Sequence, residues 1–105
     1  MIELHEVDRA TYGHDDRAVN RHSERVYTDG AGRLYSLSRT LDGGPPFFEA
    51  HGPYAKGHEG CLPRLRMDGR EYWAGGWPWK RAEAALCREI GALVVGSKHK
   101  RKEIR

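Results

Sequence analysis

The segment LPRLRMDGREYWAGGWPWKRAEAALCREIGAL, residues 62–93, decides the fold that the sequence predicts. Its first part alternates apolar and polar residues on both sides of Asp68-Gly69. This dipeptide favours a two-residue hairpin turn, because both central residues of such a turn need positive φ. The turn also sets the register, which places Leu65 opposite Tyr72. The segment therefore begins with a predicted β-hairpin.

An amphipathic helix is predicted directly after this hairpin. Pro78 suits the first helical position, because the N–H that proline lacks would have no helical partner there. Apolar residues then recur at spacings of four, four and three and trace one stripe. The stripe consists of Ala82, Leu86, Ile90 and Leu93. Glycine in a helix costs about 1 kcal/mol relative to alanine, so the regular helix is expected to end between Gly91 and Gly96.

A second hairpin is predicted between Arg25 and Leu41, with its turn at residues 29–32. The turn sequence Asp-Gly-Ala-Gly suits positive φ, and the flanking residues have a period of two. One predicted face carries Val26, Tyr35, Leu37 and Leu41, and the other carries Ser36, Ser38 and Thr40. The glycines and prolines of residues 42–46 end the pairing.

The rest of the chain gives weaker signals. Residues 1–7 alternate as a short edge strand does. Residues 8–24 hold few aliphatic side chains and predict a long loop or a short exposed helix. Residues 47–50 predict a short strand, and residues 51–60 predict a loop.

These elements predict an α+β fold: an antiparallel sheet of two hairpins, with one C-terminal helix packed on one face. At 105 residues the chain predicts a single domain over residues 1–97, followed by a basic tail over residues 98–105. The opposite sheet face is then exposed to solvent, and function is sought there. The predicted core consists of Val26, Tyr35, Leu37, Leu41, Phe47, Phe48, Leu65, Tyr72, Leu86, Ile90 and Leu93.

The basic charge of the chain is concentrated at its C-terminal end. The formal net charge is +3, and five basic residues with one acidic residue give residues 98–105 a charge of +4. The rest of the chain therefore has a formal net charge of −1. A protein that binds nucleic acid usually has its basic surface on the folded domain itself. The tail fits either a solvated C-terminus or a segment that attracts phosphate or a partner.

Arginine and tryptophan around the predicted hairpin form the candidate binding surface. Arginine forks bind phosphates or carboxylates, and tryptophan contributes contact area to interfaces. The candidate residues are Arg64, Arg66, Arg70, Trp73 and Trp77, together with Lys98, Lys100, Arg101 and Lys102 of the tail. A structural role is the alternative, because Trp77 or Trp79 can fill the corner between helix and sheet. Both interpretations stay open.

Catalytic and metal sites have little support in the sequence. One close pair of potential zinc ligands is too few for a structural site, which usually has two such pairs; the residues weighed are His51, His58, Cys61 and Cys87. Acid–base residues at positions 14–16 and 22 lie where few apolar residues could position them. Neither an enzyme nor a cofactor is expected. Two cysteines, no signal peptide and no long apolar run predict a cytoplasmic protein without a membrane span.

The order of elements over residues 65–93 resembles the arm-type DNA-binding domain of phage tyrosine recombinases. The similarity covers a strand, an Asp-Gly turn, Tyr72-Trp73, a Gly-Gly corner and a helix beginning Lys-Arg-Ala-Glu-Ala, less than a third of the chain. That family lays a three-stranded sheet in the major groove with its helix behind it. The resemblance implies DNA contacts by Arg64, Arg66 and Arg70.

The same "sheet, then helix" ending is similar to that of small phage and mobile-element proteins, including several CRISPR inhibitors that act by protein contact. A third resemblance is limited to residues 27–31, which look like the first-strand motif of ribonuclease H enzymes. That family has further carboxylates on later strands, which this sequence lacks, so Asp29 is interpreted as a turn residue.

The sequence therefore predicts a small non-enzymatic binding protein of phage or mobile-element type. It is expected to contact a protein or nucleoprotein complex, as an anti-CRISPR-like inhibitor of host defence does. The alternative is direct DNA or RNA binding through the sheet arginines and the basic tail, which predicts a steep salt dependence. The sequence leaves the partner's identity and the oligomeric state open.

Overall fold

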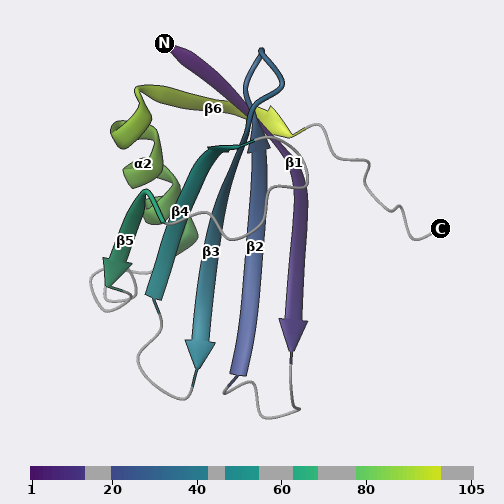
Figure 1. Ribbon diagram of the computed structural model, residues 1–105, viewed down its shortest axis with the longest axis vertical. Helices are drawn as coiled ribbons and strands as arrows, with labels where there is room; N and C mark the ends of the chain where they lie inside the picture. The colour runs from purple at the N-terminus through teal and green to yellow at the C-terminus, as the bar shows by residue number, and fades with distance from the viewer. Residues whose placement is uncertain (14–19, 43–46, 55–62, 69–77, 98–105) are drawn as a thin grey trace, which may run out of the picture.

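The computed structural model describes residues 1–13, 20–42, 47–54, 63–68 and 78–97. In these residues a six-stranded mixed sheet carries one helix on one face (Figure 1). The strand order across the sheet is β5-β4-β3-β2-β1-β6. The elements are β1 (Ile2–Gly13), β2 (Asn20–Thr28), β3 (Leu34–Asp42), β4 (Phe47–Tyr54), β5 (Leu65–Asp68), α2 (Pro78–Ile90) and β6 (Ala92–Ser97). The predicted α+β class is confirmed.

The sheet is mixed because β6 pairs with β1 in parallel, while the other pairings are antiparallel. The prediction of a purely antiparallel sheet of two hairpins is therefore wrong. The cause lies at the end of α2, where Gly91 adopts a φ of 67°. Glycine tolerates this left-handed conformation and commonly ends helices in this way. The helix stops at Ile90, before the predicted limit, and the chain returns as β6 with a hydrogen bond from the Ile2 N–H to the Gly91 carbonyl (3.1 Å).

The long pair formed by β1 and β2 contradicts the loop or helix predicted for residues 8–24. Residues 8–13 and 20–24 are strand, and their register pairs Arg9 with Arg25 and Tyr12 with His22. A strand that carries polar residues on both faces has no apolar period, so its backbone pairing leaves no such signal in the sequence. Because β6 lies outside β1, residues 1–7 also belong to an internal strand rather than to an edge strand.

The hairpin of β2 and β3 is confirmed, with one correction to its faces. Its register pairs Tyr27 with Tyr35 and Val26 with Ser36. Tyr27 therefore shares the buried face with Tyr35, and Val26 lies on the other face with Ser36. The predicted core position of Val26 is wrong by one residue, and a shift of one residue moves a side chain to the opposite face of a sheet.

Strand β4 confirms the strand predicted at residues 47–50 and extends it to Tyr54, into the predicted loop. Its partner β5 pairs Phe48 with Met67. Gly52 of β4 lies so close to β3 that an added Cβ would be 2.7 Å from the Leu34 carbonyl oxygen. The second strand of the predicted Asp68-Gly69 hairpin, residues 70–73, lies outside the described residues.

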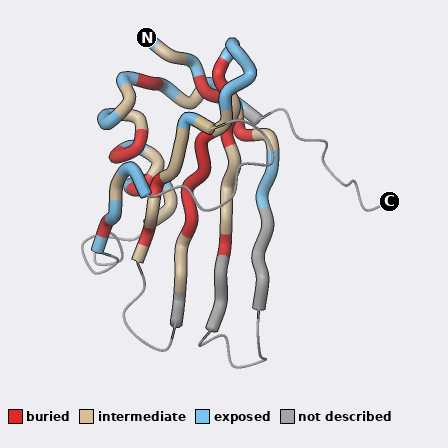
Figure 2. Tube along the Cα trace, viewed as in Figure 1, coloured by how far each residue is buried: buried red, intermediate tan, exposed pale blue. Residues whose placement is uncertain are grey.

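The core lies between α2 and the sheet, and Figure 2 shows buried segments gathered where the helix crosses the strands. The buried apolar residues are Leu4, Tyr27, Tyr35, Leu37, Phe48, Ala50, Met67, Ala82, Ala85, Leu86 and Ala92. Of the predicted core, four residues are confirmed as buried: Tyr35, Leu37, Phe48 and Leu86. Leu65 and Ile90 are partly buried against it, and Phe47 is of intermediate burial. Leu41 and Tyr72 have no described side chains.

Leu93 contradicts the predicted helical stripe, because it lies on β6 and is 52% exposed. Its neighbour Ala92 takes the inward position, paired with Ile2. No helix in the described part of the chain is long and apolar enough to cross a membrane.

Candidate functional site

A group of basic and aromatic side chains lies where the N-terminal end of α2 meets the sheet. Figure 1 shows that β1, β2 and β3 continue well past this end of the helix. Trp79, the second residue of α2, meets the Phe48 ring edge-on, with 5.2 Å between centroids and 83° between planes. The Arg25 guanidinium lies 4.4 Å from the centre of the Trp79 ring, and that of Arg39 lies 5.7 Å from it. We call the set Glu6, Arg9, Ser23, Arg25, Arg39 and Trp79 the helix-side cluster.

A β-bulge in β1 brings two members of this cluster to the same face. Glu6 and Arg9 are three residues apart, and regular alternation would put them on opposite faces. The register shifts between Glu6 and Asp8, so that Glu6 pairs with Tyr27 and Arg9 pairs with Arg25. Both partners face α2, and therefore Glu6 and Arg9 do too. Bulges often redirect a side chain in this manner next to functional sites.

Two guanidinium groups share the single carboxylate of Glu6. The Arg9 Nε and Nη2 atoms donate to Oε1 and Oε2 of Glu6, each at 2.8 Å. The Arg25 Nε lies 4.0 Å from Oε1. Glu6 is buried, while the side chains of Arg9 and Arg25 are 52% and 20% exposed. Two positive charges against one negative charge leave this group with a charge of +1 that is reachable from solvent.

A partly buried hydrogen bond fixes the helix above the cluster. The Tyr27 hydroxyl donates to Oε2 of Glu83 at 2.7 Å. Burial, reinforced by the hydrogen bond and charge of Glu83, raises the pKa of Tyr27 far above its usual value. The phenol therefore stays protonated as a donor, and the first turns of α2 keep their position over β2.

On the opposite face of the sheet, carboxylates outnumber arginine and lysine side chains among the described strand residues. The register places Glu24, Ser38, Glu49 and Arg66 in one row across four strands, all facing away from α2. Asp8 and Asp68 lie on the same face through their pairing with Val26 and Phe47. We call Asp8, Glu24, Glu49, Arg66 and Asp68 the opposite-face set. The two sides of one sheet thus differ in the sign of their charge.

The residues predicted as a binding surface are only partly described. Arg66 is exposed on the opposite face, with its guanidinium 4.1 Å from the centre of the Phe47 ring. Arg64 is also exposed, and its Nε donates to the Gly52 carbonyl at 2.7 Å. The structure does not bring either arginine to the helix-side cluster. The other candidates lie outside the described residues: Arg70, Trp73, Trp77, Lys98, Lys100, Arg101 and Lys102.

The sequence analysis missed five residues of the cluster: Glu6, Arg9, Ser23, Arg25 and Arg39. The signal that could have found them is an ionisable residue at an inward strand position, such as Arg25 two residues before Tyr27 or Arg39 two after Leu37. No sequence signal places Glu6 and Arg9 on the same face, because their common face depends on the bulge.

Asp29 has a structural role in the turn between β2 and β3. Its Oδ1 accepts hydrogen bonds from the backbone N–H groups of Ala31 (2.9 Å) and Arg33 (3.0 Å), and its Oδ2 accepts from the Arg33 Nε (2.8 Å). Burial acts to raise the pKa of this carboxyl, but the hydrogen bonds from Arg33 and Ala31 outweigh it and lower the pKa. The Asp29 carboxylate therefore makes its hydrogen bonds within its own turn.

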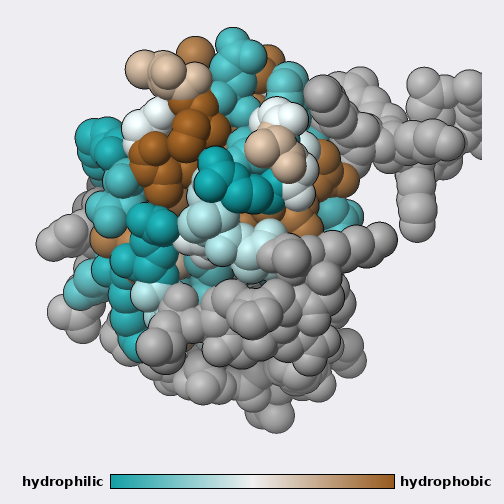
Figure 3. Space-filling view, turned by 45° about the horizontal axis from the view of Figure 1, so that its top comes forward, coloured by the Kyte–Doolittle hydropathy of each residue, from teal (hydrophilic) through white to brown (hydrophobic). Residues whose placement is uncertain are grey.

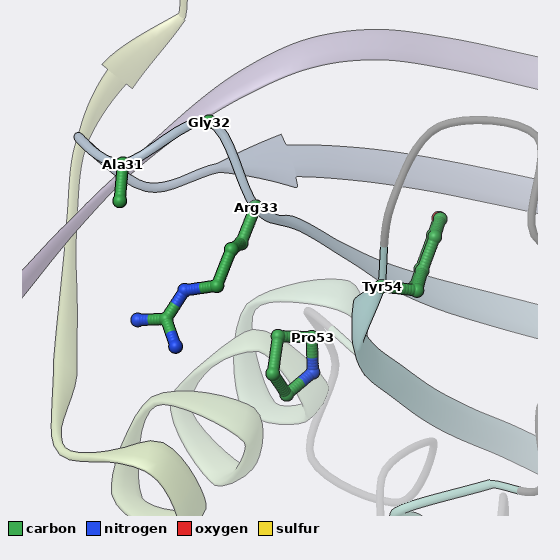
Figure 4. Close-up of a pocket in the computed structure, with 5 residues that line it drawn as sticks. All are labelled: Ala31, Gly32, Arg33, Pro53 and Tyr54. Carbon is green, nitrogen blue, oxygen red and sulfur yellow. The ribbon is translucent and has the colours of Figure 1, made fainter.

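A hollow of about 250 Å³ lies beside this turn, lined by Ala31, Gly32, Arg33, Pro53 and Tyr54. Ala31 and Pro53 lie on either side of the extended Arg33 side chain (Figure 4). The charged group lining the hollow is Arg33, whose Nε already donates to Asp29. The helix-side cluster offers more polar chemistry, and we place the candidate site there.

A cysteine and a group of exposed apolar side chains lie outside the cluster. Cys87 is half-buried on α2, where burial and then the charge of Glu83 raise the pKa of its thiol. Within the described ranges no group of three or more His, Cys, Asp and Glu side chains could hold a metal ion. Hydrophobic side chains show at the end of the molecule that carries the N-terminus and β6 (Figure 3), where Met1, Leu93 and Val95 are exposed.

No protein-family model, no curated protein and no solved structure matches this chain.

Proposed function

We propose that this protein is a small non-enzymatic binding protein that acts by contact with a protein or nucleoprotein complex, as a phage-encoded inhibitor of host defence does. The observation that carries the proposal is the helix-side cluster, in which Arg9 and Arg25 share the Glu6 carboxylate beside Trp79. Arginine and tryptophan are the residue types most enriched among those that dominate binding energy at interfaces.

The cluster is held in place before any partner arrives. Arg9 is fixed by two hydrogen bonds to Glu6, and Arg25 is fixed by the Trp79 ring, which in turn contacts the core residue Phe48. Side chains that are already ordered lose less conformational entropy on binding, at about 0.5 to 1.5 kcal/mol for each long side chain. Pre-organisation of this kind supports a binding role.

The sign of the charge favours a partner with an anionic surface, and among complexes this favours one that contains nucleic acid. The near-neutral charge outside the tail averages over a basic helix side and an acidic opposite face. A partner meets one face at a time, so the local charge decides the contact.

A second candidate function is direct DNA or RNA binding by the chain alone. It is favoured by the same excess of guanidinium groups over carboxylate at Glu6, with the basic tail as a further source of phosphate contacts. The two functions differ in whether a protein component is needed.

A pull-down from bacterial lysate tests the proposal. Tagged wild type, Arg9→Gln and the matched control Arg66→Gln are compared in nuclease-treated and untreated lysate, at low and moderate salt, with bound protein and nucleic acid both identified. Each variant removes one arginine charge, from opposite faces of the sheet.

Recovery of one discrete complex that survives nuclease, is depleted by Arg9→Gln and is kept by Arg66→Gln supports the proposed function. Nuclease-sensitive and salt-sensitive recovery of nucleic acid without a constant protein supports the second candidate. If recovery is unchanged by Arg9→Gln but lost with Arg66→Gln, the binding surface lies on the opposite face. That result would overturn the assignment of the site to the helix side.

A further inference from the structure

We infer that the helix-side cluster binds the backbone phosphates of a nucleic acid, without reading its bases. The inference rests on the proposed function and names the ligand chemistry of the same site. The observations that support it are the contacts that Arg9, Arg25 and Trp79 already make within the protein.

The Arg9 guanidinium still has donors for an external anion. Its Nε and Nη2 donate to Glu6, while half of the side chain remains exposed. A guanidinium group carries five N–H donors in a planar fork, so three of them are not used by these two hydrogen bonds. Forks of this kind bind phosphate oxygens edge-on with charge assistance.

Trp79 orients an arginine instead of serving as a platform for a base. Arg25 lies over the Trp79 ring at 4.4 Å, Arg39 lies 5.7 Å from the same centroid, and the Phe48 ring meets Trp79 edge-on. Proteins that hold single strands by their bases need open aromatic faces. Here the aromatic contacts are taken up inside the protein, which leaves guanidinium edges as the groups presented to the ligand.

The arginines are spread across the sheet in a way that suits an extended polyanion. Arg9, Arg25 and Arg39 lie on the neighbouring strands β1, β2 and β3, and adjacent strands are about 4.8 Å apart. Arg9 pairs with Arg25, whereas Arg39 pairs with Ser23, so the three guanidinium groups follow a diagonal line across the strands. Such a line contacts successive phosphates better than it surrounds a single small anion. The carboxylates of Glu24 and Glu49 on the other side repel the same ligand, so that binding is confined to one face.

The test is a titration of the purified full chain against a labelled 12-residue oligothymidylate and an oligoadenylate of equal length, read by fluorescence anisotropy at several salt concentrations. The two homopolymers are expected to bind within about threefold of each other, because phosphates carry no base information. Each phosphate contact contributes about 0.7 to the slope of log K against log salt for a single strand.

Arg9→Gln is expected to weaken binding about fivefold to tenfold and to lower the salt slope by about 0.7. The matched control Arg66→Gln is expected to stay within twofold of wild type. Arg9→Lys keeps the charge but loses the fork, so its salt slope should match that of wild type while its affinity falls by less than that of Arg9→Gln. Circular dichroism and thermal unfolding check that each variant folds.

Glu6→Gln provides a second, independent variant that acts in the other direction. It removes the negative charge that competes with phosphate for Arg9 and Arg25, while the remaining amide oxygen still accepts a hydrogen bond that orients Arg9. We therefore expect oligonucleotide binding to become severalfold tighter. A loss of affinity in a folded Glu6→Gln protein would overturn the inference.

Three results of the titration overturn the phosphate site: no binding of either oligonucleotide by wild type, a strong preference for one base, or tighter binding of polyglutamate than of oligothymidylate. If the lysate complex still depends on Arg9 in that case, the proposed function survives without the phosphate site. If the oligonucleotides bind as expected but no complex is captured, the phosphate site stands and the chain binds nucleic acid by itself.

Discussion

The two faces of the β-sheet come from the same strands but carry opposite charge. On the helix side, Glu6 is surrounded by Arg9 and Arg25 beside Trp79. On the opposite face, Glu24 and Glu49 lie in one row with Arg66. Summed over the sequence these charges nearly cancel, which makes the body look neutral. In a β protein, therefore, the charge of a residue indicates the charge of a surface only after its strand register is known.

The largest expected difference between the two sides is in packing. Leu86 of α2 is fully buried between the helix and the sheet, whereas Leu93 on β6 points to the opposite face and is 52% exposed. Leu86→Ala should lower the free energy of unfolding by about 3 kcal/mol, and Leu93→Ala by less than about 0.5 kcal/mol. Urea denaturation of the two variants measures this. Equal losses would show that both faces are packed alike and would remove the basis of the comparison.

A smaller difference is expected between two glutamates on opposite faces of the sheet, Glu6 on β1 and Glu49 on β4. Glu6 is buried and paired with two arginines, whereas Glu49 is only partly buried in its row. Glu6→Gln should cost about 2 kcal/mol, because two partly buried guanidinium groups lose their counter-charge. Glu49→Gln should cost about 0.5 kcal/mol or less. Thermal unfolding of both variants provides the measurement, and a larger loss for Glu49→Gln would contradict the assigned register.

A variant in the turn at Asp29 distinguishes an effect on folding from an effect on the charge of the helix-side cluster. Asp29→Ala loses three hydrogen bonds and should lower the free energy of unfolding by about 1 to 1.5 kcal/mol. Oligonucleotide affinity should stay within twofold of wild type, because the cluster is not altered. A change in the salt slope of this variant would show that the binding surface includes the turn.

The pH dependence of stability tests whether the ionised Asp29 carboxylate stabilises the fold. Since the folded pKa of Asp29 is lowered, its contribution is complete above the ordinary aspartate pKa of about 3.9 and is lost as the pH falls through the lower folded value. Asp29→Asn keeps an acceptor at Oδ1 but has no charge to titrate. Urea unfolding between pH 6 and pH 2.5 should show a smaller acid loss for Asp29→Asn than for wild type. Parallel curves would contradict the role of the ionised carboxylate.

The sequence predicts the local elements of this fold better than their assembly. Positive-φ residues marked the turn of β2 and β3, and Pro78 with a spaced apolar stripe marked α2, because these signals are local. The parallel return of β6 depends on one glycine conformation at Gly91 and on pairing with Ile2, ninety positions earlier in the chain. Such a long-range pairing has no local pattern.

The candidate site was harder to predict for a related reason. Its residues come from β1, β2, β3 and α2, and only Trp79 is close in sequence to the predicted Arg-Trp hairpin. Glu6 and Arg9 share a face only because of a bulge, which shifts the register by one residue. Residues 8–24 lack apolar alternation and were predicted as a loop or short helix, so Arg9 was not assigned to any sheet face.

The claim that the helix side of the sheet binds the ligand is tested most directly by NMR. Spectra of the arginine Nε–H groups are recorded while oligothymidylate is added to the full chain. We predict that the Arg9 and Arg25 signals shift in proportion to bound oligonucleotide, while the Arg66 signal, from the opposite face, stays in place. Shifts at Arg66 with unchanged Arg9 and Arg25 signals would contradict the claim that the helix side is the binding face.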